Sequence, residues 1–387
     1  MQLRLLTLNV WALPWPVSRD TSTRLRAISR KLPEIEADVV AFQEVWTRGA
    51  AAALLEGGRR AGYSNTWHNE TREGGGGLLV LSRLPILEAE FTPFRLNGLP
   101  QRLTHGDYYS GKGFVRLSLK IPGGRLCLVN THLHARYANS RENNDYVGHR
   151  AAQAVELAAG LTETREPVVA LGDFNLRENS PAYRAMIGMS RLRDVAVALD
   201  HRQNTILWEN PYRRRGAQPG IRLDYAFTRD GDTRGVRPLH VGRVLDESFQ
   251  IDGHHGSYSD HAGLLAEVEI GGTPQPMQLP EKLALDLATA LLSVGREKAQ
   301  LRRSEDRLWA GTGALASMAT MVMAQRAGMT RRRLLRAIFF GVPAAGLLSC
   351  AGITTLAEGF VPEELRGYDE IEKVVRRMRR LRMPAPA

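Results

Sequence analysis

Carboxylate, amide and imidazole side chains lie at the ends of short apolar stretches at five places in the chain. The groups are Asn9, Glu44, His132, the pair Asp173 and Asn175, and the adjacent Asp260 and His261. A divalent cation neutralises a phosphate, an imidazole accepts a proton from water, and amide or imidazole donors hold the phosphate oxygens. Metal-assisted attack of water on a phosphodiester is the chemistry that these residue types support together.

Glu44 is the residue that most clearly indicates a metal ion. It ends a strand with the apolar residues Val39, Val40 and Phe42, and an unpaired glutamate seldom ends a buried strand because desolvating its charge is costly. A hard cation such as Mg²⁺ would compensate the charge, with Mn²⁺ as an alternative ion. His132 and His134 face the same side of a strand and form an alternative metal site, but no third nitrogen ligand is evident.

Apolar strands and amphipathic helices must position these residues. Up to about residue 272 the pattern predicts strands and helices in an order that is not a regular β-α-β repeat. We expect strands at 3–10, 39–45, 78–81, 114–119, 126–131, 168–171, 223–228 and 263–270, and helices at 22–32, 50–61 and 146–162. This order favours two sheets packed face to face with helices outside, rather than a barrel of alternating units.

The composition is that of a globular protein with a basic tail. The 387 residues carry a formal net charge of +11, with 18 Lys and Arg against 11 Asp and Glu in residues 276–387 but 34 against 30 before them. A basic tail fits anionic lipid headgroups better than a nucleic-acid-binding catalytic face, and a merely soluble basic surface is the alternative. The two cysteines, Cys127 and Cys350, lie far apart, which excludes a disulfide framework and a Cys-rich zinc site.

The C-terminal third differs from the rest in hydropathy. We expect a catalytic domain at 1–272, a linker and helix at 273–307, apolar membrane-associated helices at 308–356 and a basic helical tail at 357–387. Residues 308–325 and 337–356 are uncharged, and the second stretch has the length that a bilayer core needs. Residues 3–10 at the start of the chain are predicted to form a core strand, so no signal peptide is expected.

Whether one or both apolar stretches cross the membrane stays open at this point. If only the second crosses, the arginines before residue 337 place the catalytic domain in the cytosol. If both cross as a hairpin, the basic loop between them conflicts with a cytosolic catalytic domain.

The order of Asn9, Glu44, His132, Asp173 with Asn175, and Asp260 with His261 resembles the endonuclease/exonuclease/phosphatase superfamily, as does the Leu-Asp-Tyr run at 223–225. The resemblance covers residues 1 to about 270 and implies a four-layered α/β sandwich. It implies that Glu44 is the principal Mg²⁺ ligand, with Asn9 close by. His261 would be the general base, steered by Asp224 or Asp260, while Asp173, Asn175 and His132 would hold the water and the transition-state oxygens.

Within the superfamily, the runs 8–14, 105–113, 131–137 and 148–154 look like those of neutral sphingomyelinases. The resemblance implies that Lys112 meets a phosphate oxygen and that Asp107 pairs with it as a switch. His134, Tyr137 and His149 are interpreted as structural. The implied reaction is of the phospholipase C type and cleaves sphingomyelin or a related choline phospholipid to phosphocholine and ceramide or diacylglycerol. A membrane surface and its anionic lipids are the expected partners, and no obligate protein partner is inferred.

Two rival functions remain. A DNA or RNA nuclease would use the same metal site and needs a basic face, for which Arg213, Arg214 and Arg215 are candidates. However, Val45 and Trp46 follow Glu44 where base-excision nucleases of the superfamily have Thr-Lys, which disfavours nucleic acid as a partner. A non-catalytic membrane scaffold is the second rival, and it is disfavoured because every motif residue is present.

Overall fold

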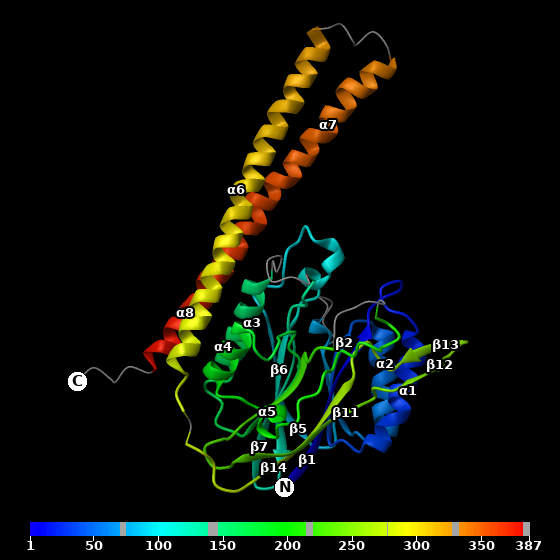
Figure 1. The fold of residues 1–387 in the computed structure, drawn as a ribbon, viewed down its shortest axis with the longest axis vertical. Helices are drawn as coiled ribbons and strands as arrows, with labels where there is room; N and C mark the ends of the chain where they lie inside the picture. The colour runs from blue at the N-terminus through cyan, green and yellow to red at the C-terminus, as the bar shows by residue number, and fades with distance from the viewer. Residues whose placement is uncertain (70–74, 138–145, 214–219, 277, 327–332, 382–387) are drawn as a thin grey trace, which may run out of the picture.

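Two stacked six-stranded sheets form the centre of the molecule (Figure 1). The computed structural model describes residues 1–69, 75–137, 146–213, 220–276, 278–326 and 333–381. The first sheet has the order β11 (Val236–Val244), β14 (Gly263–Ile270), β1 (Gln2–Ala12), β2 (Val39–Val45), β4 (Leu79–Ser82) and β3 (Asn65–His68). The second has the order β5 (Ile86–Pro93), β6 (Gly113–Ile121), β7 (Gly124–His132), β8 (Val168–Asp173), β10 (Asp224–Arg229) and β9 (Arg193–Asp194).

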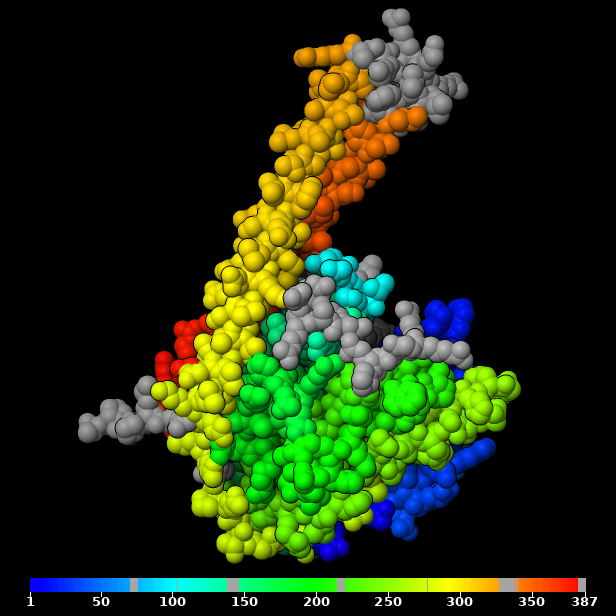
Figure 2. Space-filling view, viewed as in Figure 1, coloured from blue at the N-terminus to red at the C-terminus, as the bar shows by residue number. Residues whose placement is uncertain are grey.

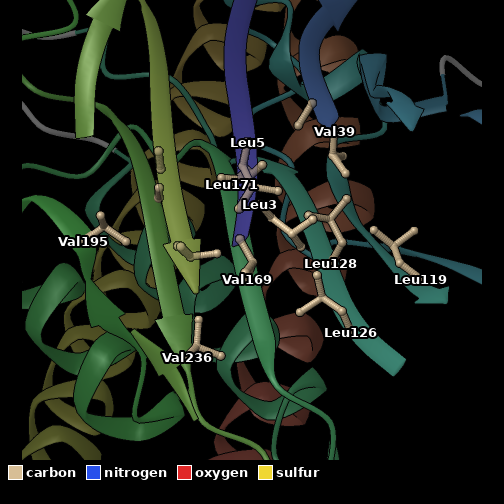
Figure 3. Close-up of a cluster of buried hydrophobic side chains, with 14 of the residues drawn as sticks. Leu3, Leu5, Val39, Leu119, Leu126, Leu128, Val169, Leu171, Val195 and Val236 are labelled. Atoms are coloured by element: carbon tan, nitrogen blue, oxygen red, sulfur yellow. The ribbon is translucent and has the colours of Figure 1, made fainter. Parts of the chain in front are cut away.

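Helices cover the outer face of each sheet. Alternation along β1 sends Leu3 and Leu5 into the core between the sheets (Figure 3), whereas Leu6 and Leu8 face the helices. The helices α1 (Thr21–Ile35) and α2 (Arg48–Arg60) pack on the first sheet, while α3 (Val147–Gly160) and α4 (Pro181–Ser190) pack on the second. The expected four-layered α/β sandwich is confirmed.

Strand pairing brings the predicted site residues to one end of the sandwich. β1 and β2 are parallel with Asn9 opposite Gln43, and β7 and β8 are parallel with His132 opposite Asp173. β10 runs antiparallel to β8 and starts with Asp224 opposite Asp173. The carboxyl ends of two parallel pairs and the beginning of β10 therefore meet.

The C-terminal region forms a long helical hairpin followed by a returning helix. Helix α6 (Lys282–Arg326) is continuous through residue 307, so the domain boundary expected there lies inside a helix. It lies beside α7 (Arg333–Thr355), and the two project beyond the end of the sandwich opposite the N-terminus (Figure 1). Among the described residues, one helical stretch, Phe340–Arg380, is long and apolar enough to cross a membrane.

The basic tail packs on the catalytic domain. After a π-helical turn (Leu356–Phe360), α8 (Val361–Arg380) lies against α3 and α6 and buries Tyr368, Ile371 and Val375 there. The chain after the hairpin therefore returns to the side from which the hairpin starts. A single crossing by residues 337–356, with the tail on the opposite side, does not fit this packing.

Two smaller groups of elements complete the described chain. A hairpin of β12 (Ser248–Ile251) and β13 (His254–Ser257) and the short helix α5 (Val195–Ala198) lie outside the two sheets. Three 3₁₀ turns, η1 (Gly75–Gly77), η2 (Leu103–His105) and η3 (Asp107–Tyr109), lie in the loops. The last two belong to the segment 94–112, which leads to Lys112 and therefore helps to form the site.

Candidate active site

Asn9 joins the two sheets at the site. Its amide nitrogen donates to Glu44 Oε1 at 2.9 Å and to Asp173 Oδ2 at 3.0 Å. Its amide oxygen accepts from the backbone N–H of Trp11 at 3.0 Å. Both polar atoms of the Asn9 side-chain amide are therefore hydrogen bonded, and the side chain holds the carboxylates of Glu44 and Asp173 in place.

Glu44 has the features of a cation ligand. The structure places its carboxylate at the end of β2 with Oε2 buried and without a hydrogen-bond partner. Burial, and then the nearby charge of Asp260, raise the pKa of Glu44 above its ordinary value. Its backbone adopts a left-handed conformation with φ of 60°, which is costly for a non-glycine residue and is typical of functional sites. A divalent cation at Oε2 would satisfy the orphaned oxygen and compensate the buried charge.

Asp224 and His261 form a hydrogen-bonded pair. His261 Nδ1 lies 2.9 Å from Asp224 Oδ2, whereas Asp260 accepts a hydrogen bond from Ser259 at 3.3 Å. Burial disfavours the charged imidazole, but the Asp224 carboxylate outweighs it and raises the pKa of His261 well above its ordinary value. Of the two aspartates left open by the sequence, Asp224 is the one in contact with His261, and Nε2 of the ring stays available.

Asp173 and Asn175 lie between Glu44 and His261. Burial and the neighbouring Asp224 raise the pKa of Asp173 to about 7. Asn175 donates its backbone N–H to Asp173 Oδ1 at 3.0 Å and its side-chain amide to the Leu133 carbonyl at 3.0 Å. Gly172 permits this arrangement, because a Cβ at that position would lie 2.1 Å from the Thr131 carbonyl oxygen of the neighbouring strand.

Lys112 lies inside the site with a carboxylate and an imidazole. Its Nζ is 2.8 Å from Asp107 Oδ1 and 3.0 Å from His132 Nε2. Burial and the Lys112 charge lower the pKa of His132 well below its ordinary value, so the ring is neutral. Burial opposes ionisation of Asp107, but Lys112 and His134 hold the pKa of Asp107 below its ordinary value. The structure therefore brings together every residue of the predicted site, with Asp260 at its edge.

The Asp107–Lys112 pair predicts a stability effect. Their side chains are only 8% and 2% exposed, so Asp107→Ala leaves a buried ammonium without a carboxylate partner. We expect a loss of about 3–5 kcal/mol in the free energy of unfolding. Adding Lys112→Met should restore much of this loss, because the unpaired charge is then removed. Urea denaturation followed by circular dichroism measures both effects, and equal losses in the single and double variants would contradict the explanation.

Several supporting residues were given no role in the predicted site, although His134 was interpreted as structural. Gln43 donates to Asn130 Oδ1 at 2.8 Å and so bridges the two sheets directly beneath the site. Ser259 donates to the backbone carbonyl of Asn9 at 2.6 Å, and His134 Nδ1 lies 3.2 Å from Asp107 Oδ2. All of them lie inside the motifs that carry the predicted ligands, and a polar residue next to a ligand in a buried strand is the signal that would have found them.

Two other features compete as sites and are less suitable. Asp173, Asp224 and His261 each offer an atom within 4.8 Å of the others, but Asp224 Oδ2 and His261 Nδ1 are already engaged in a hydrogen bond with each other. A cavity of about 710 Å³ lies near Arg229, at the end of β10 remote from Asp224. Its arginines have partners: Arg193 pairs with Asp230, and Arg229 donates to three backbone carbonyls.

A four-layered sandwich with an acidic, amide and imidazole cluster at the strand ends defines a class of metal-assisted phosphoester hydrolases. The model of the Endonuclease/Exonuclease/phosphatase family matches residues 6–261. The chain belongs to this family, and within it the resemblance to neutral sphingomyelinases is confirmed.

Three relatives are similar over most of the chain. A putative neutral sphingomyelinase of Drosophila melanogaster is 32% identical over 70% of this chain and 61% of its own length. An inositol phosphosphingolipids phospholipase C of Schizosaccharomyces pombe is 34% identical over 72% of this chain and 70% of its own. Sphingomyelin phosphodiesterase 2 of Rattus norvegicus is 28% identical over 97% and 92%. The chain thus spans about three fifths of the Drosophila protein but nearly all of the rat protein.

The fold is shared with a protein whose structure holds a DNA product. The crystal structure of D. rerio TDP2 complexed with a single-strand DNA product matches 69% of this chain and 99% of that chain, with a TM-score of 0.56 and 21% identity. At this identity the likeness shows the fold alone. The substrate must be argued from the site and its surroundings.

Proposed function

We propose that this protein is a Mg²⁺-dependent phosphodiester hydrolase of the phospholipase C type that removes the phosphorylated headgroup of a sphingolipid. The preferred substrate is sphingomyelin or a related choline phospholipid. The observation that carries the proposal is the buried cluster at the strand ends, in which Glu44 Oε2 has no hydrogen-bond partner, Asn9 links Glu44 to Asp173, and Asp224 hydrogen bonds to His261. The names of the relatives support a sphingolipid substrate.

The reaction is a direct displacement. The water oxygen forms a bond to phosphorus while the bond from phosphorus to the lipid oxygen breaks, and the lipid oxygen leaves with a proton taken from solvent. His261 accepts the water proton at Nε2, and Asp224 at Nδ1 fixes the ring and stabilises its charged form. Mg²⁺ bound by Glu44 near Asn9 would neutralise phosphate charge and polarise the bond that breaks. Asn175, Asp173, His132 and Lys112 position the water and the phosphate oxygens.

The nuclease alternative requires a basic face near the site. The described residues give little evidence for such a face. Arg213 is half-buried, while Arg214 and Arg215 lie outside the described residues. The hairpin that projects from the active-site end is better explained by a lipid substrate, because it brings this end to a membrane.

The first test is headgroup release from mixed micelles in the presence of Mg²⁺. We expect release of phosphocholine from sphingomyelin by the wild type and none by His261→Ala, with plasmid DNA left intact by both. A parallel assay with an inositol phosphosphingolipid determines the headgroup preference. Metal-dependent nicking of DNA without turnover of either lipid would contradict the proposal.

We further propose that the distal half of α6 and α7 anchor the protein in the membrane and that the catalytic domain and α8 lie together on one side of it. The packing of α8 on α3 is the reason, since residues that touch must lie on one side. In sealed vesicles, protease should degrade both the catalytic domain and a tag placed after α8, or neither of them. Protection of the tag while the catalytic domain is digested would refute this topology, and digestion in detergent serves as the control.

A further inference from the structure

Large apolar side chains are exposed on two loops of the catalytic domain. Trp15 is 88% exposed and Val17 is 61% exposed in the loop between β1 and α1. Trp208 is 72% exposed in the segment that connects α5 to β10. Tryptophan is rarely left in water to this extent without a partner, and an exposed apolar patch marks an interaction surface.

These two loops are joined at the rim of the active site. Tyr212 donates its hydroxyl to Asp20 at 3.0 Å, which ties the loop that carries Trp208 to the loop that carries Trp15. The Tyr212 ring also lies 5.1 Å from Trp11, two residues after Asn9. The loops that carry the exposed tryptophans are therefore in contact, and we call Trp15, Val17 and Trp208 on these loops the aromatic rim.

Contacts of the same loops reach the catalytic base. Asn210, two residues after Trp208, donates to the Ser259 carbonyl at 2.8 Å, and Ser259 precedes His261 by two residues. The rim is thus connected to the site by short stretches of chain, yet its three members make no contact with the catalytic groups that the structure records. A change in the rim can be made without removing a catalytic residue.

The rim and the hairpin lie at the same end of the molecule. In Figures 1 and 2 the loop after β1 (dark blue) and the segment 94–112 (cyan) both lie at the end toward which the hairpin projects. Tyr108 of that segment contacts Phe360 of the π-helical turn, with ring centroids 6.1 Å apart. Trp309, where α6 leaves the domain, is 69% exposed, as expected for a residue at a membrane surface.

The chemistry of the rim fits a lipid surface. Tryptophan favours the interface between headgroups and acyl chains, and arginine is attracted by anionic headgroups. Arg19 lies beside the rim, with its guanidinium 5.5 Å from the centre of the Tyr212 ring. A patch that combines exposed tryptophan with arginine and that shares an end with an apolar hairpin is suited to the bilayer that the hairpin enters.

We propose that the aromatic rim is a second membrane contact, which inserts into the headgroup region of the same bilayer and holds the active-site mouth against it. The hairpin attaches the catalytic domain to the bilayer at one edge of the active-site entrance, and the aromatic rim attaches it at another edge. The inference rests on the membrane anchoring proposed above and not on the identity of the headgroup. The occupant of the rim is a phospholipid bilayer, not a protein.

Insertion is tested directly and without any need for activity. Val17→Cys in the full chain, labelled with a small fluorophore, is reconstituted into phosphatidylcholine and phosphatidylserine vesicles that contain brominated lipid. We expect strong quenching at position 17 and none at Leu87→Cys, which is exposed on β5 at the other end of the sandwich. The native cysteines Cys127 and Cys350 are buried. Equal quenching at the two positions, or none at position 17, would overturn the proposal.

The functional consequence is measured with Trp15→Ala/Trp208→Ala. We expect at least about a tenfold slower turnover of lipid in vesicles, with turnover of a short-chain, water-soluble analogue unchanged within about twofold. Leu87→Ala is the matched control and should alter neither rate. Equal losses on both substrates would show a structural defect and refute the proposal. Conversion of a wild-type dimer to a monomer by the double substitution, seen by light scattering in detergent, would make the rim a self-association surface and would also refute it.

Discussion

Glu44→Gln lowers the rate of lipid hydrolysis by about three orders of magnitude and removes the stabilisation of the fold by Mg²⁺. The amide keeps the shape of the carboxylate and its contact with Asn9, but it offers no charge to a divalent cation. A bound metal supplies several kcal/mol of charge stabilisation in the transition state, and about 4 kcal/mol corresponds to a thousandfold change in rate.

The direction in which Glu44→Gln changes the stability of the fold follows from the pKa of Glu44. Burial raises the pKa of Glu44, so the ionised carboxylate destabilises the folded protein as the pH rises through that pKa. Without metal at pH 7.5, Glu44→Gln should therefore unfold at a higher temperature than the wild type, and the difference should disappear in acid. Added Mg²⁺ should raise the unfolding temperature of the wild type only, since a ligand stabilises the state that binds it.

Differential scanning calorimetry with and without Mg²⁺, beside the headgroup-release assay, measures these effects. Glu34→Gln is the matched control, because Glu34 is an exposed glutamate on α1 that pairs with Lys31. Its substitution should change neither the rate nor the Mg²⁺ dependence. A Glu44→Gln enzyme that still responds to Mg²⁺ would show that the principal metal ligand lies elsewhere, with the cluster of Asp173, Asp224 and His261 as the remaining candidate.

The central strands were predictable from the sequence because they are apolar on both faces. β2 and β8 are buried almost throughout, and continuous apolar runs that end in a polar residue are easily recognised. The edge strands β3, β5 and β11 were missed, because a strand that is half-exposed carries polar side chains and loses the apolar signal. Most of the predicted site residues lie at the ends of the central strands, which explains why they could be named before the fold was known, whereas Asp107 and Lys112 in the segment 94–112 were named from the family resemblance.

Contacts made across the molecule could not be predicted in the same way. The choice between Asp224 and Asp260 depends on the pairing of β10 with β8, which places Asp224 opposite Asp173 and within reach of His261. The position of the tail depends on the packing of α8 against α3. The charge pattern of the tail indicated a basic helix at an anionic lipid surface, although its apolar face, with Ile371 and Val375, is buried on the catalytic domain. An apolar stripe on a helix indicates that it packs but not against what.

Asp224→Asn is the substitution that best distinguishes the role of Asp224 from that of Asp260. We expect a loss of about 10³–10⁴ in the rate of headgroup release, because an amide neither fixes the required tautomer of His261 nor stabilises its charged form. Asp260→Asn should cost less than about tenfold, since Asp260 acts on His261 only through its charge and makes no hydrogen bond to it among the described residues.

The pH dependence distinguishes a positioning role from a general structural defect. Asp224 raises the pKa of His261, and the base must be neutral to accept a proton, so activity falls as the pH drops through that pKa. Removing the carboxylate lowers the pKa, and the acidic limb of kcat/KM in Asp224→Asn should move to lower pH while the plateau falls. Profiles of kcat/KM for the wild type and both variants at saturating Mg²⁺ measure the shift. An unshifted limb in Asp224→Asn, or a larger loss in Asp260→Asn, would assign the steering of His261 to Asp260 instead.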